Sequence, residues 1–154
     1  MISIREGTEA DLAAVSSLWQ QLDEFHRGLG LAFPHTSDSA QKWADSFRRT
    51  LGRFSFLWIA EQDGKPKAFL LARLKQSAPF LGGVQVGEIS DLFVDETVRG
   101  SGVASQLVAR AMSKFQGFKV HSVEVQIQTG NDPGLDFWLK QDFKPDLTLV
   151  RKVF

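Results

Sequence analysis

The spacing of the apolar residues changes along the chain, and this change limits the possible folds more than any other feature of the sequence. After a short alternating segment at 2–6, apolar side chains recur every three or four positions in 12–25 and again in 40–51, which predicts two amphipathic helices. Residues 54–61 and 68–74 then form strand-like runs, joined by a turn with the Asp-Gly pair typical of a β-hairpin. The first half therefore predicts a strand, two helices and a hairpin.

The second half predicts a strand–helix–strand unit. Residues 84–94 have the composition of a long strand, 101–115 return to helical spacing, and 123–128 alternate apolar with polar side chains. Asn131-Asp132-Pro133 suits the start of a short helix, and a final strand is expected over 148–154. Two strands joined by a helix run parallel with a right-handed connection. The complete order predicts a mixed α/β protein.

Length and composition exclude several classes of protein. The 154 residues carry 18 Lys or Arg and 18 Asp or Glu, so one domain over 1–154 is expected, with no nucleic acid and no membrane as partner. Cysteine is absent and the three histidines are scattered, which removes disulfides and thiolate nucleophiles and leaves no metal-ligand spacing. The N-terminus does not resemble a signal peptide and no apolar run could span a bilayer, so we expect a cytoplasmic protein.

The glycines at positions 100 and 102 lie between the strand at 84–94 and the helix that follows. Two glycines around one small residue let the main chain turn sharply and approach a ligand closely. The first helical amides and the helix dipole then favour an anion such as a diphosphate, and Arg99 adds a cation with forked donors. The alternative is an ordinary glycine turn with a solvated Arg99, and the residue types leave both interpretations open.

Other phosphate-binding motifs fit this segment less well. The P-loop needs a Gly-Lys-Ser/Thr ending that is absent, whereas Gly100-x-Gly102-x-x-Ser105 with Glu124 further on approaches the dinucleotide-binding pattern. In that pattern the glycines follow the strand directly, but here residues 95–99 intervene. The first half of the chain also lacks the expected series of strands and helices. The dinucleotide hypothesis is therefore rejected.

The segment from Arg99 to Ala104 resembles the Q/R-x-x-G-x-G/A signature of the GNAT superfamily of N-acetyltransferases. Downstream, the run from Asn131 to Phe143 is similar to that family's N-x-x-A-x-x-F-Y-x-x-G-F segment, and the order of elements is also similar. The resemblance implies a mixed, mostly antiparallel central sheet with helices on both faces and one parallel, splayed strand pair. It also implies an enzyme that transfers an acetyl group from acetyl-CoA, or another acyl-CoA, to a primary amine of a small molecule or peptide.

The resemblance further implies which residues bind acyl-CoA. The splayed end of the strand would pair with the pantetheine arm, and the glycine turn would hold the diphosphate. Asn131 would touch the CoA arm, although capping of the last helix explains it equally well. The implied binding residues are Leu92, Phe93, Val94, Arg99, Gly100, Ser101, Gly102, Val103, Ala104 and Asn131.

Glu88 is the favoured catalytic base, because its place six residues before Val94 is similar to that of the catalytic Glu in histone-modifying members of the family. A protonated amine must lose a proton before it attacks, and a carboxylate can accept that proton directly or through water. Asp91 is the alternative. Regular alternation puts these two carboxylates on opposite faces of the strand, so only one is expected to face the site unless a bulge intervenes.

One departure from the family pattern opens a second function. Trp138 stands where the family has a Tyr that protonates the leaving thiolate, and the chain contains no tyrosine. An indole is not an acid at physiological pH, which leaves water or Ser90 to supply the proton. The alternative function is a non-catalytic acyl-CoA-binding regulatory module. The final strand could also pair across a homodimer, as is common in similar proteins.

Overall fold

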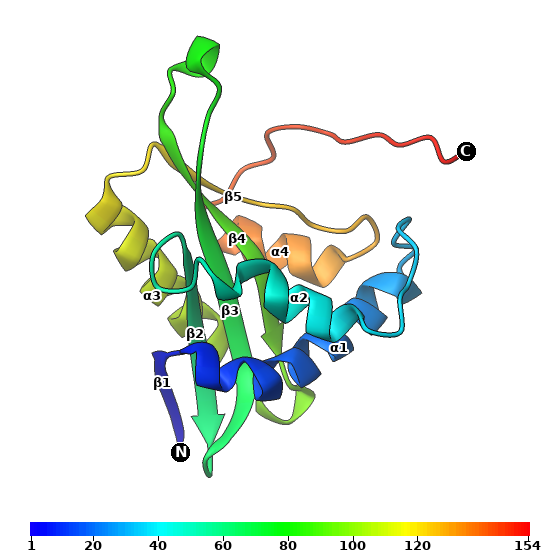
Figure 1. The fold of residues 1–154 in the computed structure, drawn as a ribbon, viewed down its shortest axis with the longest axis vertical. Coiled ribbons are helices and arrows are strands. Elements are labelled where there is room, and N and C mark those ends of the chain that lie inside the picture. The colour runs from blue at the N-terminus through cyan, green and yellow to red at the C-terminus, as the bar shows by residue number, and fades with distance from the viewer.

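A five-stranded sheet forms the centre of the computed structural model, which describes every residue from Met1 to Phe154 (Figure 1). The strands lie side by side in chain order, and all neighbours are antiparallel except the last pair, which is parallel. This arrangement confirms the predicted mixed, mostly antiparallel sheet with one parallel pair. The strands are β1 (Ile2–Glu6), β2 (Ser55–Gln62), β3 (Lys65–Gln76), β4 (Gln85–Val94) and β5 (Ser122–Val125).

Helices cover both faces of the sheet, as expected. On one face lie α1 (Leu12–Gly28) and α2 (Ser39–Arg48), and on the other lie α3 (Val103–Phe118) and α4 (Asp132–Lys140) (Figure 1). The first three helices have the apolar stripes that their sequences predicted, and those stripes are what they bury. None of the helices combines the length and the apolar character that crossing a membrane requires.

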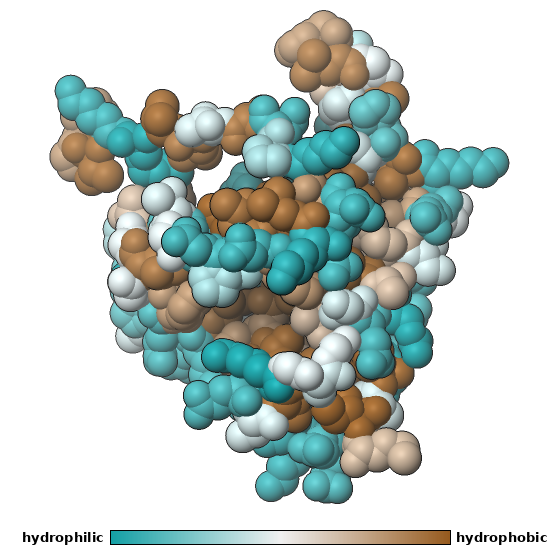
Figure 2. Space-filling view, turned by 180° about the vertical axis from the view of Figure 1, so that it is seen from behind, coloured by the Kyte–Doolittle hydropathy of each residue, from teal (hydrophilic) through white to brown (hydrophobic).

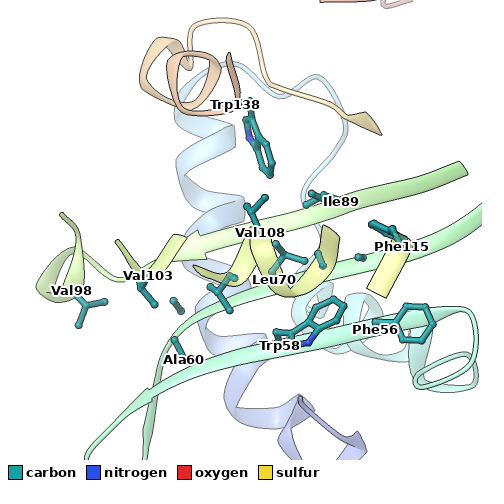
Figure 3. Close-up of a cluster of buried hydrophobic side chains, with 14 residues drawn as sticks. Phe56, Trp58, Ala60, Leu70, Ile89, Val98, Val103, Val108, Phe115 and Trp138 are labelled. Atoms are coloured by element: carbon teal, nitrogen blue, oxygen red, sulfur yellow. The ribbon is translucent and has the colours of Figure 1, made fainter. Parts of the chain in front are cut away.

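Two apolar cores lie on either side of the sheet. In the larger one, side chains from β2, β3 and β4 pack against α3, and Trp138 of α4 points toward Val108 of α3 (Figure 3). In the smaller one, Leu12, Val15 and their neighbours in α1 and α2 pack against the opposite faces of β2 and β3. The alternating burial along these strands follows from the two-residue period of a strand. The sheet is therefore held rigidly between two layers.

The hairpin between β2 and β3 has the predicted turn. Asp63 and Gly64 both adopt the left-handed conformation, with φ angles of 53° and 73°. This pair of angles defines the tight turn whose twist matches that of antiparallel strands. Asp-Gly is one of the few dipeptides that adopts it readily, so the local sequence sufficed to predict it.

The prediction of a final strand over 148–154 is wrong. Residues 144–154 belong to no helix or strand and are all exposed, and Figure 1 shows them leaving the body as an extended segment. Their alternating apolar residues suit a strand, but a strand forms only where a partner edge is in reach. No such edge lies beside this segment in the same chain. β5 is likewise shorter than the 123–128 expected, because the chain separates from β4 after Val125.

Candidate active site

The parallel strands β4 and β5 separate halfway along β4. Their pairing runs from Val86–Ser122 to Ile89–Val125 and then stops, whereas β4 continues to Val94 with only β3 beside it. One main-chain edge of residues 90–94 is therefore free of a strand partner. Leu92 and Val94 pack toward the core beneath α3, and Phe93 packs toward α1 and α2. The expected splayed strand pair is present, and Leu92, Phe93 and Val94 lie on its open side.

A β-bulge interrupts β4 at the same place. Asp91 lies opposite Leu71 and Ile89 opposite Ala72, so Ser90 has no partner of its own on β3. The extra residue reverses the alternation, and as a result Glu88 and Asp91 both line one pocket. Regular alternation would have put these carboxylates on opposite faces, and the bulge is the exception to it that the sequence left open. The bulge brings the two candidate bases together.

The turn before α3 presents a row of unpaired amides. Gly100 and Gly102 adopt left-handed conformations with φ angles of 75° and 82°, which other residues adopt at a cost. The main-chain N–H groups of residues 100–105 donate to no acceptor within the chain. The first main-chain hydrogen bond of α3 is donated by the Gln106 N–H to the Gly102 carbonyl. Six neighbouring unpaired N–H groups at a helix N-terminus are an arrangement that favours an anion.

Buried apolar residues and a side-chain bond fix this turn. Val98 and Val103 are 4% and 3% exposed and anchor its two ends in the core, while the Ser101 hydroxyl donates to the Val98 carbonyl. Arg99 is exposed, and its Nε donates to the Val94 carbonyl at 3.1 Å. The Arg99 guanidinium thus lies between the open end of β4 and the turn. Ala104 follows in the first turn of α3 and is partly exposed.

Asn131 caps α4, as one of its two sequence interpretations proposed. Its Oδ1 accepts a bond of 3.0 Å from the Gly134 amide. Only the side-chain oxygen takes part in this bond, so the Nδ2 group is free to donate elsewhere. The cap and a contact with a ligand are therefore compatible.

Glu88 is held between two cations. Arg73 Nε donates to its Oε1 at 2.7 Å, and Lys75 Nζ contacts its Oε2 at 3.0 Å. Burial raises the pKa of the Glu88 carboxyl, but the hydrogen bonds from Lys75 and Arg73 outweigh it and leave this pKa below its usual value. Lys75 also pairs with Glu124, so Glu124 is salt-bridged. A carboxylate so engaged is a weak base.

Asp91 has the opposite environment. Its Oδ2 accepts a bond of 3.1 Å from the indole Nε1 of Trp43, which stacks on Trp19 with ring centroids 5.5 Å apart. Burial raises the pKa of Asp91 to about 6, against the lowering effect of the indole donors. Protein atoms surround the carboxylate although part of its surface faces the pocket. A carboxylate with a pKa near neutrality can accept and release a proton at physiological pH.

A pocket of about 510 Å³ contains both carboxylates. Residues of α2, β3 and β4 form most of its walls, together with the start of β2 and the residue after the end of β5. The pocket therefore adjoins the place where β4 and β5 separate. The aromatic rings of Trp43, Phe47 and Phe54 and the hydroxyls of Ser46, Thr50 and Ser90 are among its lining groups. Six of its 14 lining residues are hydrophobic and the others are polar or charged, so the pocket suits a small polar molecule.

The sequence analysis missed the contribution of Trp43, Arg73 and Lys75. Trp43 belongs to the apolar stripe expected at 40–51 and does pack in the core, but its indole N–H also contacts Asp91. Arg73 lies directly opposite Glu88 on the neighbouring strand. Only the register of β3 against β4 would have revealed this pair, and the sequence alone does not determine that register. Trp138, by contrast, is only 6% exposed and packs against Phe137 and Phe143.

The comparisons agree with this fold. A profile of the Acetyltransferase (GNAT) family matches residues 17–143, so the chain belongs to that family. The comparison of the sequence with curated proteins gives no significant match.

Several solved structures share the fold. A tetramutant of the BH1408 protein from Bacillus halodurans aligns with a TM-score of 0.84 and 23% identity over 99% of both chains. A predicted acetyltransferase from Clostridium acetobutylicum, solved with acetyl-CoA, aligns with a TM-score of 0.79 and 18% identity over 99% of this chain and 96% of that one. Glucosamine-6-phosphate N-acetyltransferase from Arabidopsis thaliana aligns with a TM-score of 0.72 and 18% identity over 100% and 99%. At these sequence identities the similarity shows a shared fold and nothing more.

Proposed function

We propose that one domain spanning residues 1–154 transfers an acetyl group from acetyl-CoA directly to a primary amine of a small molecule or peptide. The observation that carries this proposal is the row of free amides at 100–105 beside the open edge of β4, with a two-carboxylate pocket reached from the same strand. The amides suit a diphosphate, and the open strand edge suits the amide groups of pantetheine. The pocket has the size and polarity for the amine.

The acyl-CoA proposal assigns a role to each predicted binding residue. The amides of residues 100–105 would hold the diphosphate, and Arg99 would add a positive charge at the end of β4. The free main-chain edge at Leu92, Phe93 and Val94 would pair with the pantetheine arm. The Nδ2 group of Asn131 would donate to the same arm. The acetyl-CoA bound to the Clostridium acetobutylicum protein, which has the same fold, supports this choice of donor.

The reaction needs few specialised side chains. The amine nitrogen attacks the thioester carbon, the C–S bond breaks, and the proton of the amine passes to a carboxylate directly or through water. A main-chain N–H of the β4 edge aimed at the thioester oxygen would lower the barrier by about 3 kcal/mol. Holding the amine beside the thioester contributes about 7–11 kcal/mol more. Correct positioning of the amine, the thioester and the main-chain donor would therefore account for most of the rate enhancement.

Asp91 replaces Glu88 as the proposed base. The pKa of Asp91 is raised to about 6, whereas the pKa of Glu88 is lowered and both its oxygens bind cations. Glu88 would instead fix Arg73 and Lys75 at the wall of the pocket. Ser90, whose Oγ lies 3.4 Å from Glu88 Oε1, or water would protonate the leaving thiolate.

One observation favours the second candidate function, a non-catalytic acyl-CoA-binding regulator. The side chain in the place of the family's Tyr is Trp138, which is buried in the core and offers no acid to a thiolate. A regulator would bind acetyl-CoA and need no such acid.

Two measurements distinguish the candidates. Calorimetry with acetyl-CoA tests binding for the natural protein, for Arg99→Ala and for a control, Lys65→Ala, at the exposed start of β3. Release of free CoA is then followed with a panel of primary amines. We expect saturable binding that Arg99→Ala weakens and Lys65→Ala does not, and turnover with at least one amine. Binding without turnover on any amine would support the regulator, and no binding would refute both candidates.

A further inference from the structure

A second pocket, of about 410 Å³, lies between the edge of the sheet and the second half of α3. We call it the α3 pocket. Glu6 of β1 and Trp58 of β2 form one wall, and residues 110, 113, 114, 117 and 118 of α3 form the other. The first four of these helix residues are three or four positions apart, so they lie on one face of α3. Three elements therefore enclose this space.

The α3 pocket is separate from the proposed active site. Trp58 belongs to the core beneath α3, whereas Phe47 and Leu71 of the two-carboxylate pocket belong to the core on the other face of the sheet. Along α3, Lys114 lies ~16 Å from Val103, which follows the glycine turn, because a helix rises about 1.5 Å per residue. A ligand in the α3 pocket would touch neither the amine nor the diphosphate.

The apolar groups that stand out most from the surface lie elsewhere. Figure 2 shows the β3–β4 tip, where Phe80 is 86% exposed, and residues 144–154 projecting away from the body. Both features are convex and would touch a small molecule on one side. Small-molecule sites are concave, so the α3 pocket is the better place for such a ligand.

Trp58 supplies the α3 pocket with a hydrogen-bond donor that the fold does not use. The residue is only 2% exposed, and its indole N–H donates to no acceptor within the chain, unlike that of Trp43. No fully buried side-chain nitrogen or oxygen in this protein lacks a partner, so the small accessible part of Trp58 includes its nitrogen. Since Trp58 lines the α3 pocket, this N–H opens into it. A donor in so dry a place favours a ligand with an acceptor atom.

The charges of the α3 pocket favour an anionic ligand. Arg110 is exposed and forms no ion pair or side-chain hydrogen bond, so its forked donors are free to hold a carboxylate. Lys114 contacts the Glu6 carboxylate at 3.3 Å. The two cations exceed the one carboxylate by a single positive charge. Ser113 adds a hydroxyl on the same face of α3.

The end of α3 leaves room for a flat apolar group. A β-carbon added at Gly117 would meet nothing within 4 Å, and glycine weakens a helix, so this space is kept at a cost in helix stability. Beside it, the Phe118 ring packs on Phe56 with centroids 5.4 Å apart and is still 39% exposed. We infer that the α3 pocket binds a small aromatic carboxylate. Its carboxylate accepts from Trp58 and Arg110, and its ring lies over Gly117 and against Phe118.

Benzoate is the simplest probe of this inference. Heteronuclear NMR spectra should contain one indole N–H signal for each of the four tryptophans, and each signal is first assigned to its residue. On titration with sodium benzoate, the Trp58 signal should shift saturably with a Kd of about 1 mM or below, while the signals of Trp19 and Trp43 stay in place. Sodium chloride at equal concentration controls for salt. Acetate, which lacks the ring, and benzyl alcohol, which lacks the charge, should each bind at least about tenfold more weakly.

Two variants and a matched control test the assigned contacts. Arg110→Gln should weaken benzoate binding about tenfold, because a charge-assisted bond is lost. Arg49→Gln removes an equally exposed arginine after α2, on the other face of the sheet, and should leave the Kd unchanged. Gly117→Leu should abolish binding by filling the space for the ring, and urea unfolding checks that this variant is folded.

Three results would overturn the inference. They are a Trp58 signal that does not move at about ten times the expected Kd, equal weakening by Arg110→Gln and Arg49→Gln, and benzoate binding that survives Gly117→Leu. None of these measurements involves acetyl-CoA or an amine. The proposed enzymatic function could therefore fail while the α3 pocket stands, and the reverse.

Discussion

Replacing Asp91 with Asn should make the protein more stable and far less active. The carboxylate lies beneath Trp43, where burial raises its pKa from 3.8 to about 6. At neutral pH the folded chain therefore holds a charge in a place that disfavours charge. Asn has nearly the same shape, has no charge, and can still accept the indole hydrogen bond. The substitution removes an electrostatic cost and, with it, the proposed base.

The pKa of Asp91 sets the size of the effect. A difference of about two pH units between the folded and unfolded carboxyl, at about 1.4 kcal/mol per unit, corresponds to about 3 kcal/mol. Between the two pKa values the folded chain binds more protons than the unfolded one, so the stability due to this group falls as pH rises. The loss begins near pH 3.8 and is complete above about pH 6. Asn does not titrate and shows no such loss.

Urea unfolding measures this difference directly. The unfolding free energies of the natural protein and Asp91→Asn should be similar at about pH 3.5 and differ by about 3 kcal/mol at about pH 7.5, because other titrating groups cancel in the comparison. In a CoA-release assay with a saturating amine, kcat of the natural protein should fall below about pH 6. In the Asn variant, kcat should no longer fall in this pH range, and its value should be about 10²–10⁴-fold lower than that of the natural protein.

Two results would refute the reasoning. A stability difference that stays constant across this pH range would mean that Asp91 is not held with a raised pKa. An unchanged limb in kcat would mean that another group accepts the proton.

Three further outcomes follow from the structure. Glu88→Gln should keep the fall of kcat at low pH but move its midpoint slightly lower, because the charge of Glu88 helps to raise the pKa of Asp91. The same substitution should lower the unfolding free energy at pH 7 by about 1 kcal/mol, a difference that should vanish in urea titrations as the pH falls through the lowered pKa of Glu88. Arg99→Ala should weaken acetyl-CoA binding about tenfold and reduce its salt dependence in calorimetry, and a wholly salt-independent loss would contradict a charge contact. Gly87→Ala should cost about 1–3 kcal/mol in urea unfolding, because the added carbon would lie 2.7 Å from Phe115. Gly117→Ala, which meets nothing within 4 Å, should instead stabilise α3 by about 0.4–1 kcal/mol, and equal effects at the two glycines would contradict the packing argument.

Local chemistry made much of this fold predictable. Asp63-Gly64 permits few turns other than the one observed, and the apolar stripes of α1 and α3 match the cores that they bury. The glycines at 100 and 102 adopt the left-handed conformations for which glycine is suited. In each case a few neighbouring residues decide the conformation, so the sequence pattern carries the information.

Features that depend on distant partners were not predictable in this way. The bulge at Ser90 arises from the pairing of β3 with β4, and nothing in the local sequence marks it. The raised pKa of Asp91 comes from burial by elements that are distant in the chain, among them α2, whose Trp43 lies 48 positions before Asp91. Residues 148–154 have the pattern of a strand, but pairing depends on an edge, and the only free edge near β5 is not reached by the same chain.

The position of β4 has a consequence for how such a protein can diversify. The carboxylates of Glu88 and Asp91 and the open main-chain edge at 90–94 belong to one strand, so a fixed number of peptide units separates the proposed acceptor side from the proposed donor side. The walls contributed by α2 and the start of β2 belong to other parts of the chain. Changes in length or composition there can admit a different amine without altering the spacing between the two reactants.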